Sequence, residues 1–229
     1  RARELVERND RRWDAVYARH QTAGRGRQGA HWYDTPGLSM LVSLILWETP
    51  TPEPIWLTGL LAALATAQAL EAHYPALPLV QLKYPNDVML HGRKLGGVLT
   101  EVVEGTAIVG IGVNLGQTQF PPDLAERAIS VRMAVCSHLA AEFETPPTVD
   151  ALILTLYQNL LRLLERWRTH PDEVVLLWRA RDDSIGRAYR IYDLPEQPVG
   201  VALGVVPDFR LHLRLPNGTE HTTYYVSAV

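Results

Sequence analysis

Hydrophobic residues form runs of strand and helix length in the first half of the chain, and each run ends at turn-forming residues. The run Ser39–Trp47 (SMLVSLILW) is nearly all apolar and is followed by ETPTPEP, which predicts a buried strand. The run from Ile55 to Tyr74 predicts a helix within the core, ended by the segment YPALP. Three turns are expected further on, at residues 85–87, 91–92 and 104–105. Strand-like runs fill residues 79–116 in quick succession, and this order predicts an α+β fold with a mixed sheet.

Two helical regions are expected next. The first covers roughly Pro122–Phe143, where apolar residues are frequent. The second begins after Thr148, a residue type that caps helix N-termini, and ends near Pro171. Its apolar positions recur near the helical period of 3.6 residues, at Leu152, Leu156, Leu160, Leu163 and Trp167.

The patterning changes again around Asp182-Asp183. In the segment FRLHLRLPNGTEHTTYYV, hydrophobic residues alternate with Arg and His, and Asn217-Gly218 follows as a turn. This combination predicts a β-hairpin, so the tail is expected to be a small all-β domain. The predicted division of the chain is a domain over residues 1–183 and a second over 184–229.

The segment GRGRQG, Gly24–Gly29, matches the pattern G-x-G-x-x-G of dinucleotide-binding folds. Those folds need a buried strand before the loop and a helix that starts within it. Here ARHQTA precedes the loop, and Pro36 and Gly37 prevent a helix after it. Two interpretations remain: a solvated basic turn, or a mobile loop that brings the guanidinium groups of Arg25 and Arg27 onto a phosphate or carboxylate.

Composition bounds the class of protein. The 229 residues are 47% hydrophobic and 21% charged, as expected for a globular chain. A net charge of −3 gives no basic excess, so no nucleic-acid partner is expected. The single cysteine, Cys136, excludes a disulfide within the chain, and the charged opening stretch has no apolar signal segment; both favour the cytoplasm. The most apolar segment, Ile55–Leu70, is too short to span a bilayer, so no membrane role is expected.

Three segments, QTAGRGRQGAHW, KYPNDVMLHGRKLGGVLTE and IVGIGVNLG, follow one another along the chain. In this order and at these spacings they resemble the biotin–protein ligase family. The family pattern is a GRGRRG loop, then K-W-P-N-D followed by a K-[LI]-x-G-[IV]-L-x-E strand, then G-I-G-[IV]-N. The resemblance covers nearly the whole chain, because the β tail is similar to the family's small SH3-like β-barrel C-terminal domain. It implies the monofunctional type, since no helix-turn-helix segment is seen in this sequence.

The resemblance implies a two-step reaction that uses ATP with Mg²⁺. Biotin's carboxylate attacks the α-phosphate to give biotinyl-5′-AMP and pyrophosphate, and a lysine of a biotin carboxyl carrier domain, from acetyl-CoA carboxylase or a related carboxylase, then takes the biotin. The residues that match biotin-binding positions are Gln21, Arg25, Gly26, Arg27, Trp32, Lys94 and Gly97. Those that match ATP-binding positions are Arg25, Arg27, Lys94 and Asn114. The catalytic set is Lys94, Arg27, Arg25 and Asp87, and a homodimer is one assembly that fits the family.

The chemistry of these residue types agrees with that reaction. Negative charge accumulates on the phosphate oxygens in the first step, so fixed cations and a divalent metal are the main requirement. Arg25, Arg27 and Lys94 supply positive charge, and Gly96 and Gly97 leave room for a ligand to approach the backbone. Closure of the loop would also keep water from the acyl-adenylate.

Several roles stay open at this point. Asp87 has four candidate roles: orienting Lys94, helping to hold Mg²⁺, assisting the incoming amine, or accepting backbone N–H bonds in a turn. Trp32 suits core packing as well as contact with biotin's aliphatic tail, and Asn114 suits a structural amide as well as the nucleotide side. The eight histidines include no pair at metal-ligand spacing, so no zinc site is expected.

The sequence also departs from the family pattern. Gln28 and Ala30 stand where relatives commonly carry basic residues, and Tyr84 replaces the usual Trp. The family's S-T-N element, expected some twenty residues before Gln21, is not seen, and we expect it to precede Arg1. Two alternative functions follow: a related lipoate or octanoate ligase, which lacks GRGRxG in its loop, or a catalytically weakened homologue that binds biotin.

Overall fold

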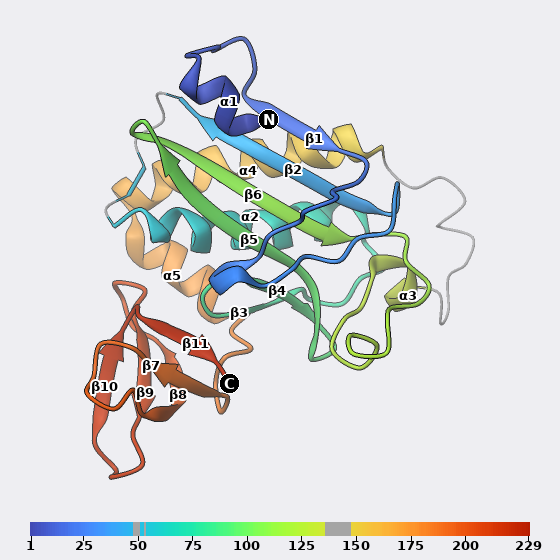
Figure 1. The fold of residues 1–229 in the computed structure, drawn as a ribbon. Coiled ribbons are helices and arrows are strands. Elements are labelled where there is room, and N and C mark those ends of the chain that lie inside the picture. Colours follow the sequence, from blue (N-terminus) through green and yellow to red (C-terminus); the bar gives the residue numbers. More distant parts are fainter. Residues whose placement is uncertain (48–50, 53, 136–147) are drawn as a thin grey trace.

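The larger of two β-sheets has six antiparallel strands and lies in the N-terminal half of the chain (Figure 1). The computed structural model describes residues 1–47, 51–52, 54–135 and 148–229. The sheet has the spatial order β1-β2-β6-β5-β4-β3. Its strands are β1 (Ala15–Ala18), β2 (Ser39–Leu46), β3 (Gln81–Lys83), β4 (Asp87–Leu90), β5 (Arg93–Val103) and β6 (Thr106–Asn114). The apolar run at 39–47 is therefore a central strand, paired on both sides, as its hydrophobicity predicts.

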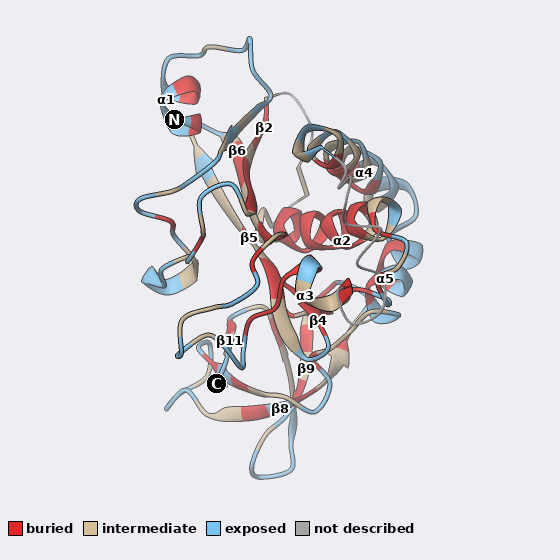
Figure 2. Cartoon of the chain, turned by 90° about the vertical axis from the view of Figure 1, so that its right-hand side faces the viewer, coloured by how far each residue is buried: buried red, intermediate tan, exposed pale blue. Residues whose placement is uncertain are grey.

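One face of this sheet is covered by helices. Helix α2 (Trp56–His73) lies on the sheet, and α4 (Val149–Thr169) packs over α2. Figure 2 shows α2 buried along its length, while α4 has a buried side and an exposed side. An all-round apolar sequence such as that of α2 suits a helix enclosed between two layers. The helix predicted from Ile55 to Tyr74 is confirmed, because these two residues are its caps.

Helix α4 confirms the predicted cap and period. The Thr148 hydroxyl accepts a hydrogen bond from the Ala151 amide at 3.3 Å. Four of the predicted apolar positions are buried, namely Leu152, Leu156, Leu160 and Leu163. The chain then bends at His170, and Pro171 opens a further helix, α5 (Pro171–Arg179), which the sequence pattern did not separate. Proline is tolerated in the first turn of a helix, so Pro171 begins α5 shortly after α4 has ended.

The C-terminal sheet, residues 188–228, has five antiparallel strands in the order β10-β9-β8-β7-β11. Its strands are β7 (Ala188–Ile191), β8 (Val199–Val205), β9 (Leu211–Arg214), β10 (Glu220–Thr223) and β11 (Val226–Ala228). The predicted hairpin is confirmed, with β9 paired to β10 and Gly218 at a φ of +86° in the turn. Phe209, Leu211 and Leu213 are buried, as their alternation predicts.

The two sheets are joined beside β3 and β4. The Leu82 amide donates to the Arg181 carbonyl at 2.7 Å, and the Tyr84 amide donates to the Ser184 hydroxyl at 2.8 Å. At the start of α2, the ring centroid of Trp56 lies 3.7 Å from that of Tyr224, which lies between β10 and β11. The C-terminal sheet is therefore fixed next to the turn that connects β3 with β4.

Two expectations need correction, and two short elements were not predicted. The expected mixed sheet is not found among the described pairings, because every pairing between the named strands of this sheet is antiparallel, and only isolated bridges such as Leu82–Asp182 are parallel. The strands from β3 to β6 are joined in sequence by hairpins, whereas parallel neighbours would need crossovers. The helix expected over Pro122–Phe143 is found only in part, because residues 122–127 form turns and α3 covers Val131–Val135. The rest of that expected helix, including Cys136, lies outside the described residues. The short helix α1 (Ala2–Glu7) and the half-exposed edge strand β1 carry no strong apolar period, and the pattern missed both. Across the part of the chain that is described, no helix is both long and apolar enough to cross a membrane.

Candidate active site

The face of the large sheet opposite α2 carries the candidate site. On β5, Thr100 lies toward Gly59 of α2, so the alternating residues Gly97 and Glu101 point to the open face. A cavity of about 1050 Å³ lies over this face and extends to the C-terminal sheet. The cavity is lined by all nine predicted site residues: Gln21, Arg25, Gly26, Arg27, Trp32, Asp87, Lys94, Gly97 and Asn114. Three segments far apart in the sequence thus contribute to one site.

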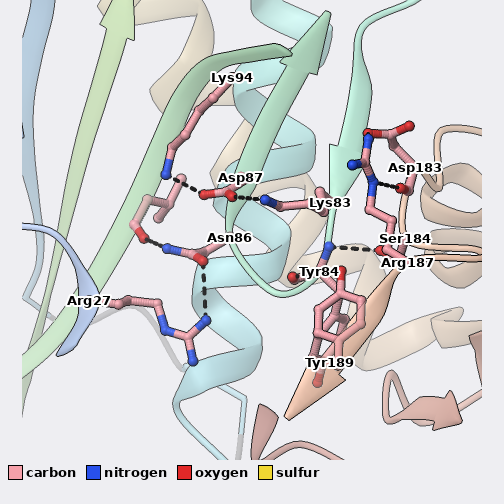
Figure 3. Close-up of polar contacts among 11 residues, drawn as sticks. Arg27, Lys83, Tyr84, Asn86, Asp87, Lys94, Asp183, Ser184, Arg187 and Tyr189 are labelled. Atoms are coloured by element: carbon pink, nitrogen blue, oxygen red, sulfur yellow. Dashed lines mark hydrogen bonds and ion pairs between the residues drawn. The ribbon is translucent and has the colours of Figure 1, made fainter. Parts of the chain in front are cut away.

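Asp87 lies between two lysines (Figure 3). Its Oδ1 is 2.5 Å from Nζ of Lys94, and its Oδ2 is 2.8 Å from Nζ of Lys83. Burial raises the pKa of Asp87, but the ammonium groups of Lys94 and Lys83 outweigh it and hold the pKa below its usual value of 3.8. The carboxylate is therefore ionised at neutral pH and fixes both ammonium groups.

A β-bulge brings Lys94 to the same face as Gly97. Strict alternation would place residues three apart on opposite faces of a strand. The pairing of β4 with β5 shifts between Val88 and Met89, so that Val88 is opposite Gly96 whereas Met89 is opposite Lys94. As a result, a Cβ added at Gly97 would lie 3.3 Å from Nζ of Lys94. The extra residue aims the lysine into the cavity.

The backbone of Lys94 is fixed from the side away from β4. Its amide donates to the Arg127 carbonyl at 2.7 Å, and its carbonyl accepts from the Ile129 amide at 3.0 Å. The Arg127 carbonyl and the Ile129 amide are thus engaged by β5, so they are not available for the hydrogen bonds of a helix continuing through this stretch. Lys94 is held through both its main chain and its side chain.

The GRGRQG loop lies between β1 and β2 and is folded back on itself. The Trp32 amide donates to the Gly24 carbonyl at 3.0 Å, and the Gly26 amide donates to the Ala30 carbonyl at 2.7 Å. At the tip, Gln28 has a φ of +53°, a conformation that few non-glycine residues adopt. No α-helix begins here, as Pro36 and Gly37 predict, so the dinucleotide interpretation lacks its required helix N-terminus.

The two arginines of the loop have different partners. Arg25 is largely exposed, and its guanidinium lies 3.6 Å from a carboxylate oxygen of Glu101. Arg27 is largely buried and donates to Oδ1 of Asn86 at 3.4 Å and to the Val226 carbonyl at 3.1 Å. Burial lowers the pKa of the Arg27 guanidinium, against the opposing charge of Asp87. Asn86 is itself fixed, because its Nδ2 donates to the Val98 carbonyl at 2.5 Å.

Trp32 covers the glycines of the open face. A Cβ added at Gly112 would lie 2.7 Å from Cε2 of Trp32, and one added at Gly97 would lie 3.6 Å from Cζ3. The ring centroid is 5.9 Å from Nζ of Lys94. The buried indole N–H has no hydrogen-bond partner among the described residues, so a polar ligand atom could satisfy it.

Asn114 is buried at the end of β6 and serves the protein framework. Its Nδ2 donates to the Ile129 carbonyl at 3.1 Å, and its Oδ1 accepts from Gln117 at 3.5 Å. Gln117 also donates to the Ser39 hydroxyl at 2.7 Å. These contacts favour a structural amide, although Asn114 also lines the cavity.

Lys83, Asn86 and Glu101 contact predicted site residues but were not singled out from the sequence. All three lie in the segment KYPNDVMLHGRKLGGVLTE, so the motif contained the signal. Tyr192 and Val226 gave no such signal, because only the fold brings the C-terminal sheet to the loop. Among the described residues, no group of three or more His, Cys, Asp or Glu side chains gathers to hold a metal ion.

Comparison with known proteins defines the class. Residues 8–117 match the model of the Biotin/lipoate A/B protein ligase family, and that stretch includes the GRGRQG loop, the turn with Asp87 and the strands β5 and β6. The cavity described above is therefore built mainly by the region that characterises this class.

Curated relatives narrow the class. The chain is 32% identical over 204 residues to a biotin–[acetyl-CoA-carboxylase] ligase of Mycobacterium tuberculosis, covering 86% of this chain and 72% of that protein. It is 33% identical over 228 residues to the bifunctional ligase/repressor BirA of Bacillus subtilis, covering 96% of this chain and 67% of that protein. The chain belongs to the biotin protein ligase family.

Solved structures agree on the fold. A biotin protein ligase from Aquifex aeolicus, in complex with biotin and ATP, has a TM-score of 0.77 at 22% identity, covering 94% of this chain and 88% of that chain. One from Leishmania major, in complex with biotin, has a TM-score of 0.66 at 23% identity, covering 96% and 92%. The predicted α+β class and the biotin protein ligase fold are confirmed, whereas the SH3-like barrel character of the C-terminal sheet stays a prediction.

Proposed function

We propose that this chain activates biotin with ATP to biotinyl-5′-AMP and transfers biotin to a lysine of a biotin carboxyl carrier protein. The observation that carries this proposal is that Arg27 of the GRGRQG loop lines the same cavity as Asp87 and Lys94, which lie on the neighbouring strands β4 and β5. The family membership and the names of the relatives, which include a biotin–[acetyl-CoA-carboxylase] ligase, support the same substrates.

In the proposed first step, Lys94 and Arg27 stabilise the charge that develops on the α-phosphate oxygens. Lys94 is suited to this because its ammonium and its backbone are both fixed, so little reorganisation is needed during the reaction. Arg25 lies on the same loop and supplies a third cation once it leaves Glu101. Gly112 leaves room for the Trp32 ring to lie close against the sheet, where it offers the ligand an apolar wall.

For Asp87, the geometry supports orientation of Lys94. Both carboxylate oxygens pair with lysine ammonium groups, a setting that does not suit a metal ligand. We therefore propose that Mg²⁺ arrives on the phosphates of ATP and is not held by Asp87. The bound metal would neutralise charge on those phosphates.

In the proposed second step, the carrier lysine attacks the acyl carbon and AMP leaves. The loop tip lies beside the C-terminal sheet, so the loop and this sheet together would keep water from the adenylate. We propose that the domain boundary lies near residues 183 and 184, where the chain passes from α5 to β7. We also propose a cytoplasmic location, no nucleic-acid partner and a homodimer as a candidate assembly.

The test is to incubate the chain with biotin, MgATP and a carrier domain, and to follow pyrophosphate release and the mass of the carrier. We expect biotin-dependent pyrophosphate release and one biotinylated lysine. Parallel reactions with lipoate and octanoate test the related ligase activities, and a preference for either would replace the proposal. Binding of biotin without pyrophosphate release would identify a biotin-binding homologue that lacks the activity.

A further inference from the structure

The tip of the GRGRQG loop contacts the C-terminal sheet through two neighbouring residues. Arg27 donates to the Val226 carbonyl at 3.1 Å, and Nε2 of Gln28 donates to the Tyr192 hydroxyl at 3.1 Å. The Tyr192 hydroxyl also lies 2.7 Å from Oγ of Ser227. These residues are far from the base of the loop, which is closed separately by the bond from Gly37 to Arg19.

We propose that Gln28, Tyr192 and Ser227 form a clasp by which the C-terminal sheet positions Arg27 in the active site. Tyr192 directly follows β7 and Ser227 lies on the neighbouring strand β11, so the sheet fixes the two hydroxyls relative to each other. The hydrogen bonds from Ser227 and Gln28 also hold the pKa of Tyr192 below its usual value. Gln28, Tyr192 and Ser227 are thus positioning residues that act through Arg27.

The identity of residue 28 fits this role. A glutamine amide donates a hydrogen bond to the tyrosine without adding a second positive charge beside Arg27. Its backbone is in the left-handed region at a φ of +53°, and Gly29 follows at +78°. This turn aims the side chain of Gln28 at Tyr192 while Arg27 points to Asn86. The departure from the basic residue expected here therefore has a structural function.

Trypsin cleavage after Arg27 tests the clasp, because Arg27 must leave Asn86 and Val226 to enter the protease. The variants are Gln28→Met, which keeps the length but removes the donor, Tyr192→Phe, and the two combined. Cleavage after Arg12, whose side chain is 78% exposed, is the internal reference. Tyr225→Phe, at a tyrosine that is 62% exposed, is the matched control.

We expect Tyr192→Phe to raise the rate of cleavage after Arg27 by about 2- to 5-fold, the effect of losing one partly exposed hydrogen bond. In the Gln28→Met background, Tyr192→Phe should have no further effect, because the bond is already lost. Tyr225→Phe should leave the rate unchanged. No change with Tyr192→Phe, or an equal increase in both backgrounds, would overturn the proposal.

The catalytic consequence rests on the proposed function. With biotin and MgATP, Tyr192→Phe should increase the fraction of adenylate released into solution by a similar factor, with the KM for biotin unchanged. A wild-type chain that forms no adenylate would contradict the proposed function, while the cleavage experiment would still decide on the clasp. Increased cleavage with unchanged release from an active enzyme would show that the contact holds the loop without positioning Arg27 for the reaction.

Discussion

Lys94 and Arg27 line the same cavity, but the chain holds them in different ways. Lys94 lies on a central strand, with its backbone bonded to Arg127 and Ile129 and its ammonium paired with Asp87. Arg27 lies at the tip of a loop and is held by single bonds to Asn86 and Val226. Displacing the backbone of Lys94 would break hydrogen bonds of its strand, whereas displacing Arg27 breaks only the hydrogen bonds of its side chain.

This difference corresponds to two requirements of adenylate chemistry. Charge stabilisation is most effective when the cation is already in place, as Lys94 is. Entry of two substrates and protection of a hydrolysable intermediate require a part that moves, as the loop can. The comparison can be tested by removing each cation and each contact that holds it.

Replacement of Lys94 should have the largest effect. We expect Lys94→Ala to slow biotin-dependent pyrophosphate release by about 10²- to 10³-fold, because one preorganised charge is lost from the transition state. Circular dichroism and the thermal midpoint should show that the fold remains. Lys83→Ala removes the other partner of Asp87 and should cost less; an equal loss in both variants would contradict a direct role for Lys94.

Asp87→Asn should reduce stability by about 2–3 kcal/mol at pH 7, because two ammonium groups then lack a counter-charge. The folded-state pKa of Asp87 lies below 3.8, so its contribution is complete above that pH and is lost as the pH falls through the folded-state value. Urea unfolding at several pH values should therefore give a constant difference between wild type and variant from pH 7 to about 4, and a shrinking one below. A difference that grows on acidification would reverse the assigned sign.

Arg27→Ala should slow adenylate formation by about 10- to 10²-fold and increase adenylate release, since this arginine both stabilises charge and holds the loop. Quenched-flow analysis with separation of bound and free adenylate measures both quantities. Arg19→Ala removes an equal charge from the exposed base of the loop and should leave both nearly unchanged. If Arg19→Ala behaved like Arg27→Ala, net charge alone would explain the effect.

The contact between Trp32 and the sheet should give the smallest change. Gly112→Ala would place a methyl group 2.7 Å from Cε2 of Trp32, so the indole must move. We expect biotin affinity to fall by about 10-fold, measured by calorimetry. Gly110→Ala adds the same methyl on the same strand, where the nearest atom is the Leu99 carbonyl oxygen at 3.4 Å, and should bind biotin nearly as wild type does. Equal losses would show that strand distortion, not the position of Trp32, is responsible.

The parts of the fold that sequence patterns predicted are those with strong apolar periods. Helices α2 and α4 and strand β2 follow from their own residues, because each buries a long apolar face. The bulge that turns Lys94 toward Gly97 could not be predicted, since the register of two strands decides it. The different partners of Arg25 and Arg27 could not be predicted either, because Glu101 and Val226 lie far away in the sequence.

The site residues also divide into features that the sequence predicted and features that depend on the whole fold. The motifs identified Lys94, Asp87 and Arg27 by resemblance, and the fold brings them to one cavity. Asn114 illustrates the limit of a motif, because its amide is engaged by Ile129 and Gln117 in the framework. A short motif identifies which residue types occur together, but hydrogen-bond partners depend on the whole fold.

The bond between Arg27 and Val226 joins residues 199 positions apart, and this separation orders the events of synthesis. Asp87 and Lys94, on β4 and β5, leave the ribosome well before β11 is made. The loop made much earlier must wait for β11 before Arg27 finds its carbonyl acceptor. A chain that still lacks β11 therefore has no Val226 acceptor for Arg27, although it already contains every residue that holds Lys94.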